Sequence, residues 1–481
     1  MAKEKHQRQT LSRICTYALL SLPLFSLSGC IEYHPKPLDP LLINQHLSQR
    51  SLEIQGLKIF LEQQGQTLHT WPLKQWNLNQ LTLAGLYFHP ELKISQAAWQ
   101  QAQAKQQQAA QRVNPQLSIT PTFNASNDLP SPWILSSLLN FSFESAGKRQ
   151  IRQQQAEQLS ESARLTLANS AWQIHSRIRQ QLEQLWFSKQ QQRLLSQQQQ
   201  LQRESLHRVE QQYAAGNLSA LELVRVRLAP EQSQLALLDI KRQYADRLIQ
   251  LASALGLYPE ALHQIQFDFS ELNQSLTKSD LKQLRQRALS NHAQLLLRLA
   301  DYRSSEANLQ LAIAQQYPDI QLGPGYEYDQ GSNKWSLGLG ITLPFFHNQE
   351  PQIAAAESQR RAAAARFEAQ QLKVVQGVAQ ALSGYAAAKV KKQTADLIQK
   401  DVEQQLKRAQ ARLQAGVLSA ADLIAVHLQN TSAKLAQLNA QAALQQAKGA
   451  LEDASQRPIK ANHALWQHTL SYSVPNDNGG R

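Results

Sequence analysis

Cysteine and methionine are nearly absent from this sequence. Only two cysteines occur among 481 residues, and the single methionine is Met1. Cys15 lies in an N-terminal segment that we expect to be removed, and Cys30 is expected to be modified, so no thiol remains to form a disulfide. The protein must therefore be stabilised by packing and assembly. The lack of internal methionine also excludes a thioether relay for soft copper or silver ions.

The sequence motifs of common enzyme classes are missing as well. We find no phosphate-binding glycine loop, no Gly-x-Ser-x-Gly turn and no His-Glu-x-x-His sequence. The 13 histidines are scattered, and no two of them stand four residues apart on one helical face. His89 and His292 occupy equivalent positions and are interpreted as helix-start residues. The sequence therefore predicts neither an enzyme nor a cofactor or metal site.

Long apolar runs are absent too. The stretch from Ile14 to Leu27 follows Lys3, Lys5, Arg8 and Arg13 and is too short to span a bilayer, so residues 1–29 are predicted to be a secretory signal peptide. The sequence Leu27-Ser-Gly-Cys30 resembles the lipobox of bacterial lipoproteins, which would make Cys30 the lipidated first residue. The alternative is an ordinary signal peptide with an incidental cysteine. Pro35, Pro37 and Pro40 then indicate an extended tether.

Acidic residues are outnumbered by basic ones. The chain carries 49 Lys and Arg against 36 Asp and Glu, a formal net charge of +13. Residues 1–29 hold four of these basic residues and one acidic residue, so the mature chain has a net charge of +10. An exported lipoprotein does not meet nucleic acid, so we interpret the excess as solvated helix surface and expect no nucleic-acid partner.

What the sequence does contain is a duplication. The segment Tyr213-Ala-Ala-Gly-Asn-Leu-Ser-Ala-Leu-Glu-Leu223 returns 200 residues later as Leu413-Gln-Ala-Gly-Val-Leu-Ser-Ala-Ala-Asp-Leu423. His89 and His292 also correspond, as do Pro115 and Pro318. The fold is therefore a tandem repeat. We expect a tether and packing segment at 30–87, repeats at 88–279 and 280–457, and a C-terminal tail at 458–481.

Each repeat contains two segments that alternate between apolar and polar or small residues, with turn-forming residues between them at 124–132 and 329–333. Such segments are typical of hairpin strands with one apolar face, as membrane barrels require. Four strands cannot close a barrel, so the chain must oligomerise if the sheet lies in lipid; two copies would give eight strands and three would give twelve. The alternative is a soluble four-stranded sheet with a covered edge. The alternating positions are Leu117, Ile119, Pro121 and Phe123; Leu139, Phe141 and Phe143; Ile320, Leu322, Tyr326 and Tyr328; and Trp335, Leu337, Leu339, Ile341 and Leu343.

Two very long helices are predicted because no proline interrupts 147–215, and Pro351 suits the first turn of a helix that runs to 415. Each ends at an Ala-Gly pair, and the next helix restarts at Ser219 or Ser419, both good N-caps. Shorter helices are expected at about 90–112 and 219–256. A narrow apolar stripe, interpreted as a coiled-coil seam and not a globular core face, comprises Ile174, Ile178, Leu182, Leu185, Leu194 and Leu201.

Together these features resemble the TolC family of outer-membrane efflux ducts. The duplicated turn matches, as do the junction Phe143-Glu-Ser-Ala-Gly-Lys-Arg149, the strand end Leu343-Pro-Phe-Phe346 and the helix start Pro351-Gln-Ile-Ala-Ala-Ala-Glu357. The resemblance implies a mainly α-helical chain with a small transmembrane β part. It further implies a homotrimer with a twelve-stranded barrel in outer-membrane lipid and a helical periplasmic tunnel. The implied partners are a periplasmic adaptor and an inner-membrane pump of the RND type.

The resemblance also assigns roles to residues at the ends of the long helices. Residues at the periplasmic tips would contact the adaptor, although turn geometry alone is an alternative reason for the glycines. Asp422 and Glu222, each six residues after its tip glycine, would narrow the pore and favour cations. The sequence departs from the pattern at Ala425, where a second acidic residue is expected. The implied adaptor-contact residues are Gly216, Leu218, Ser219, Gly416, Leu418 and Ser419.

The predicted function is that of a passive exit duct in a tripartite efflux system, anchored in the outer membrane of a Gram-negative bacterium. The Ala-Gly-Lys-Arg junction and the Phe-Phe-His-Asn-Gln-Glu-Pro turn resemble ducts that serve exporters of divalent heavy metals. Multidrug efflux and type I protein secretion are the alternatives within this class. From another class, a lipid-anchored coiled-coil scaffold that conducts nothing would use the same helices, but it has no reason for strands with an apolar face.

Overall fold

The structure is a computed structural model that describes residues 32–125, 131–273 and 276–458. The predicted signal peptide, Cys30 and the predicted tail from residue 459 onward lie outside these residues. The chain divides into a short N-terminal unit that ends at Gln49 and a large unit from Arg50 onward. In the first unit, helix α2 (Pro40–Ser48) starts at Pro40, where the Asp39 side chain accepts hydrogen bonds from Leu41 N and Leu42 N. The prediction that Pro40 belongs to an extended tether was therefore wrong, because proline also suits a first helical turn.

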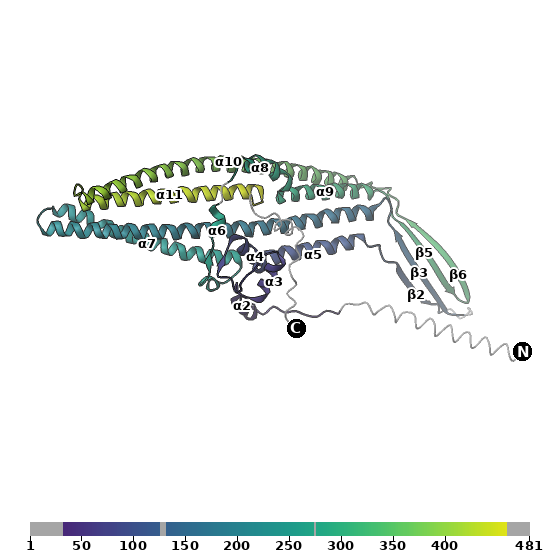
Figure 1. Cartoon of the computed structure of the whole chain (residues 1–481). Coiled ribbons are helices and arrows are strands. Elements are labelled where there is room, and N and C mark those ends of the chain that lie inside the picture. The colour runs from purple at the N-terminus through teal and green to yellow at the C-terminus, as the bar shows by residue number, and fades with distance from the viewer. Residues whose placement is uncertain (1–31, 126–130, 274–275, 459–481) are drawn as a thin grey trace. The chain divides into compact units, whose positions relative to one another are not determined.

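The two repeats have the same order of elements, which Figure 1 shows along the chain. The first consists of α4 (Leu78–Phe88), α5 (Pro90–Ala110), β2 (Gln116–Phe123), β3 (Trp133–Phe143), α6 (Lys148–Ala214) and α7 (Ala220–Leu255). The second consists of α8 (Lys278–Asn291), α9 (Ala293–Ala314), β5 (Ile320–Asp329), β6 (Ser332–Ile341), α10 (Glu350–Gln414) and α11 (Ala420–Ser455). The fold is mainly helical and duplicated, as predicted. The expected boundary at residue 88 falls at the end of α4, whose counterpart α8 lies at the start of the second repeat.

The four long helices form two antiparallel pairs. Helix α6 has 67 residues and α10 has 65, so each extends for about 100 Å at the usual rise of about 1.5 Å per residue. Helix α6 packs along α7, α10 packs along α11, and α6 also contacts α11. Within the described residues, no helix is both long and apolar enough to cross a membrane.

The four strands form one antiparallel sheet in the order β2-β3-β5-β6. Each repeat contributes a hairpin, and the two hairpins join through β3 and β5, with Phe143 opposite Ile320. The hairpin of the second repeat turns over Gln330 and Gly331, both of which have positive φ, as a two-residue hairpin turn requires. Leu343, which was predicted within the last strand, follows the end of that strand at Ile341.

The main hydrophobic core lies where α4 and the preceding helix α3 (Gln55–Gln63) pack against the middle of α6 and the end of α7. Ile174, Ile178, Leu182 and Leu185 on α6 are all fully buried in this core. Their interpretation as a coiled-coil seam was therefore wrong, because a globular cluster covers them. Burial of four such side chains contributes about 6–12 kcal/mol. Gly85 brings α4 close to α6, since an added Cβ would lie 2.5 Å from Cδ1 of Ile178.

A small parallel sheet completes this region. Strand β1 (Gln75–Trp76) pairs with β4 (Gln266–Phe267), so the segment before the first repeat is joined to the segment after it. Trp76 is 1% exposed and belongs to the main core. Two short 3₁₀ helices, Pro259–Leu262 and Ser270–Asn273, flank β4. This region therefore holds the first repeat to the 50–77 segment.

Candidate functional site: an apolar sheet face and the helical tips

One face of the four-stranded sheet is apolar and exposed. Residues directly opposite each other in an antiparallel ladder share a face, so the registers place the alternating residues of all four strands on the same side. Trp335 on the outer strand is 82% exposed and Leu337 is 71% exposed. An exposed apolar surface of this extent marks an interaction site. The face consists of Leu117, Ile119, Pro121, Phe123, Trp133, Leu135, Leu139, Phe141, Phe143, Ile320, Leu322, Pro324, Tyr326, Tyr328, Trp335, Leu337, Leu339 and Ile341, interrupted by Ser137 and Asn333.

The opposite face of the sheet carries polar and small residues. Ser136 Oγ donates a hydrogen bond to Glu327 Oε2 over 3.0 Å, and Lys334 Nζ lies 3.7 Å from Glu327 Oε1. Ile134 and Leu138 are the apolar exceptions. Cδ1 of Leu138 would lie 3.1 Å from a Cβ added at Gly323, so the glycine leaves room for it. The strands thus have the two-faced character that the sequence predicted.

An ion pair between a buried lysine and a partly exposed aspartate fixes the junction between the sheet and the long helix α6. Lys148 is buried, and its Nζ donates to Tyr317 O over 2.6 Å and to Asp319 Oδ1 over 2.7 Å. The same carboxylate oxygen accepts a hydrogen bond from Ser145 N over 3.0 Å. Because Lys148 begins α6 in the first repeat and Asp319 precedes β5 in the second, this contact ties the two hairpins together where they leave the helices. The junction motif 143–149 therefore has a structural role.

The two helical tips have the geometry that the sequence predicted. Gly216 and Gly416 have φ values of 75° and 72°, the left-handed conformation that ends α6 and α10 without strain from a Cβ. Ser219 caps α7 through a hydrogen bond that its side chain accepts from Glu222 N, and Ser419 caps α11 through one that its side chain accepts from Asp422 N. Leu218 and Leu418, just before these caps, are half-buried.

Glu222 and Asp422 lie in the first turns of α7 and α11, and both are exposed. Glu222 Oε2 accepts hydrogen bonds from Ser219 N and Ser219 Oγ, at 3.2 and 3.3 Å. Asp422 Oδ2 accepts one from Ser419 Oγ over 2.6 Å. Within the described residues, neither carboxylate bonds to the other tip. A single chain therefore places the two acids at equivalent ends of two hairpins and does not bring them into one site.

The predicted helix-start histidines are confirmed in their positions. His89 is the N-cap residue of α5 and His292 that of α9, and both are buried. Burial, together with the smaller effect of the nearby Lys373 charge, lowers the pKa of His292 to about 4. The residues that the structure describes contain no group of His, Cys, Asp and Glu that could hold a metal ion.

Sequence reasoning missed a buried charge cluster that joins the repeats. Arg179 on α6 is 3% exposed, and its guanidinium pairs with Glu183 over 2.9 Å and with Asp453 on α11 over 2.8 Å. Glu452 lies 3.7 Å away. Burial raises the pKa of Glu183 to about 7, against the opposing effect of Arg179. A Cβ added at Gly449 would overlap Nη1 of Arg179, so this mid-helix glycine makes room for the guanidinium. The i,i+4 spacing of Arg179 and Glu183 was a further signal of part of the cluster.

Comparison with known proteins identifies the relatives of this fold. The structure of the outer membrane protein VceC from Vibrio cholerae aligns with a TM-score of 0.66 and 20% identity, over 80% of this chain and 97% of that one. The CmeC outer membrane channel of Campylobacter jejuni aligns with a TM-score of 0.63 and 15% identity, over 84% and 87%. CusC, whose structures were described in terms of transmembrane channel formation, aligns with a TM-score of 0.65 and 17% identity, over 90% and 100%.

At the level of sequence, no curated protein matches the chain significantly. A family model described as outer membrane efflux protein matches residues 86–257 and 284–455. These segments fall in the two repeats and together make up more than half of the chain. This match confirms the resemblance that the duplicated turn and the strand ends indicated. The protein belongs to the outer membrane efflux protein family, the family of TolC.

Proposed function

We propose that three copies of this chain close their sheets into a barrel in the outer membrane and form an exit duct for efflux. The observation that supports this most strongly is the apolar face of a sheet whose outer strands, β2 and β6, have no partner strand within the described residues. Lipid does not tolerate unpaired strand edges, so a sheet with this face needs closure by further copies.

The residues of the polar face favour three copies over two. Eight strands, from two copies, enclose a space that side chains fill, whereas more strands leave a wider interior. The polar face carries Gly323, Gly325, Gly338 and Gly340, which are too small to fill a narrow barrel. A twelve-stranded barrel from three copies leaves an aqueous lumen lined by this face. The helices that continue from the strands would then extend the lumen into the periplasm.

At the far end of these helices we propose two roles for the tips. Gly216, Leu218 and Ser219, with their equivalents Gly416, Leu418 and Ser419, would contact a periplasmic adaptor that couples the duct to an inner-membrane pump. The exposed turns with left-handed glycines support this role. Asp422, gathered around the threefold axis, would form a ring of carboxylates that favours cations, and Glu222 would lie in the equivalent tip.

Conductance measurements test this proposal directly. Purified protein reconstituted in planar bilayers should form cation-selective pores that divalent ions block. The Asp422→Asn variant keeps the Ser419 cap, because Ser419 Oγ accepts from the backbone N of residue 422. It should therefore fold normally while losing cation selectivity and divalent block. Glu222→Gln, at the equivalent tip, measures separately how much the second predicted carboxylate contributes to selectivity. Unchanged conductance, selectivity and block in Asp422→Asn would exclude the carboxylate ring.

The alternative of another class, a lipid-anchored scaffold, makes the opposite prediction for the wild-type protein. A scaffold should give no pores and no heat-modifiable migration on a gel, whereas a barrel trimer should give both. The anchor itself is proposed at Cys30, so Cys30→Ser should abolish incorporation of labelled palmitate. This variant does not affect the strands and should leave pore formation by the purified protein intact.

The transported substrate follows from the pump that the duct serves. Divalent heavy metals are the substrate that the resemblance favours, and drugs and secreted proteins are the alternatives. These substrate classes are separated by the growth of a deletion strain, and of the same strain complemented with the wild-type gene, in the presence of zinc, cobalt, cadmium, dyes and antibiotics. Selective sensitivity to the metals would support heavy-metal efflux, and broad drug sensitivity would overturn it.

A further inference from the structure

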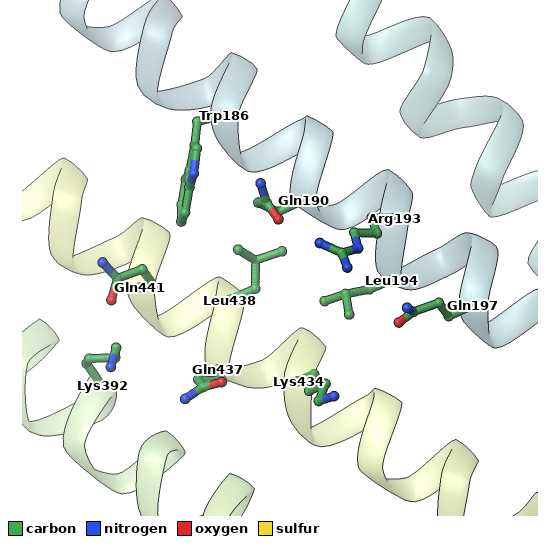
Figure 2. A pocket seen from close by; sticks show the side chains of 10 residues that line it. All are labelled: Trp186, Gln190, Arg193, Leu194, Gln197, Lys392, Lys434, Gln437, Leu438 and Gln441. Atoms are coloured by element: carbon green, nitrogen blue, oxygen red, sulfur yellow. The ribbon is translucent and has the colours of Figure 1, made fainter. Parts of the chain in front are cut away.

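A pocket of about 470 Å³ lies in the groove between the two repeats, where α6 faces α11 and α10 adds one residue. Its volume is within the range of small-molecule sites, about 300–1,000 Å³. It is separate from the helical tips and from the sheet. Figure 2 shows the side chains that line it: Trp186, Gln190, Arg193, Leu194 and Gln197 from α6, Lys434, Gln437, Leu438 and Gln441 from α11, and Lys392 from α10.

The charge of this pocket is positive. Its lining includes three basic side chains and no acidic one. Lys392 is paired with Asp396, since its Nζ lies 2.6 Å from Asp396 Oδ1. The same oxygen accepts a hydrogen bond from Gln437 Nε2 over 2.7 Å. Arg193 and Lys434 are different: neither has a hydrogen bond or an ion pair within the described part of the chain. Two cations on facing helices are therefore left for an external anion.

The rest of the pocket combines apolar and amide groups. The indole of Trp186 and the side chains of Leu194 and Leu438 lie between the two helices in Figure 2. Leu438 is 9% exposed and forms the buried base of the pocket. The amides of Gln190, Gln197 and Gln441 can each donate and accept hydrogen bonds. An aromatic and aliphatic surface beside unpaired cations is complementary to a ligand with an apolar body and an anionic head.

We propose that this pocket binds an amphipathic organic anion, a carboxylate or sulfonate attached to a ring or chain. The anionic head would lie between Arg193 and Lys434, where a guanidinium gives bidentate hydrogen bonds and an ammonium adds a second positive charge. The apolar body would cover Trp186 and the two leucines. A divalent metal cation does not suit this site, because both unpaired side chains would repel it.

Isothermal titration calorimetry tests the proposal on the purified mature chain in a non-ionic detergent, so the result is separate from pore formation. The anionic probe is naphthalene-2-sulfonate, and the matched cationic probe is naphthalen-2-ylmethylammonium. The sulfonate should bind and the ammonium should not. Arg193→Gln and Lys434→Gln should each weaken sulfonate binding about tenfold, and the double variant about a hundredfold.

A control variant removes the same charge elsewhere. Arg149 and Arg366 are exposed and lie on α6 and α10, far along each helix from the pocket. The double variant Arg149→Gln and Arg366→Gln should bind the sulfonate as the wild type does. Equal binding of the two probes, undiminished binding to the pocket double variant, or an equal loss in the control would each overturn the proposal. Thermal unfolding of all the variants, compared with the wild type, shows that the fold is retained.

Discussion

Lysine substitutions at two neighbouring residues of β6 test which face of the sheet meets lipid. Leu337 lies near the middle of the strand, on the apolar face, and is 71% exposed in the single chain. Ser336 precedes it and points to the polar face. A Lys at the bilayer midplane on the lipid side of a barrel costs about 2–4 kcal/mol. In the proposed barrel of three copies this cost becomes about 6–12 kcal/mol, enough to prevent stable insertion.

The assay is the yield of heat-modifiable protein in outer membranes, with urea titration of the purified variants in lipid vesicles. Leu337→Lys should lose nearly all inserted protein and unfold at much lower urea. Ser336→Lys, which adds the same side chain one residue away, should insert as the wild type does and shift the selectivity of the pore toward anions. Normal insertion of Leu337→Lys, or failure of Ser336→Lys alone, would refute the assignment of the faces.

Three further predictions concern the stability of the folded chain, measured by thermal unfolding. Gly449→Ala should destabilise it by about 3–5 kcal/mol, because the methyl group displaces the buried guanidinium of Arg179 and breaks its ion pairs; an unchanged melting temperature would contradict this. Gly416→Ala, at a φ of 72°, should lower the free energy of unfolding by about 1–2 kcal/mol. Gly377→Ala, inside α10 with open space around it, should raise the free energy of unfolding by about 0.5–1 kcal/mol. The reverse order would contradict the tip geometry. Folding lowers the pKa of His292 from 6.5 to about 4, so the unfolded chain takes up this proton first as the pH falls. The free energy of unfolding should therefore be independent of His292 above pH 6.5 and should fall by about 3 kcal/mol between pH 6.5 and 4. His292→Asn should flatten this pH dependence, and an equally steep loss in that variant would exclude the assignment.

Local signals in the sequence account for most of the fold. The period-two strands, the proline-free helices and the caps at Ser219 and Ser419 depend on residues close together in the chain. Each forms where it was predicted, except that the last strand ends at Ile341 and does not include Leu343. Ile174 and Ile178 show where such reasoning fails. Helical periodicity identifies an apolar stripe but not what covers it, and here α4 covers it from nearly a hundred residues earlier. The β1–β4 pairing between residues 75–76 and 266–267 is a similar long-range contact that no local pattern reveals.

The candidate site was predictable to the same extent. Asp422 and Glu222 were assigned by the resemblance to the TolC family, which places acidic residues at this distance from the tip glycines. They lie in the first turns of α11 and α7, and their role at a pore stays a prediction. Whether they form a ring depends on the threefold assembly, which one sequence does not determine. The pocket with Arg193 and Lys434 gave no signal in the sequence, because it forms only where two repeats meet.

Closure of the sheet by three copies is tested most directly by the mass of the assembly, extracted from membranes in mild detergent and measured by native mass spectrometry. We expect a species of three chains, because the proposed barrel needs the open edges of β2 and β6 to be paired and its polar face to enclose a lumen. A stable single chain or a dimer as the main membrane-inserted species would contradict it.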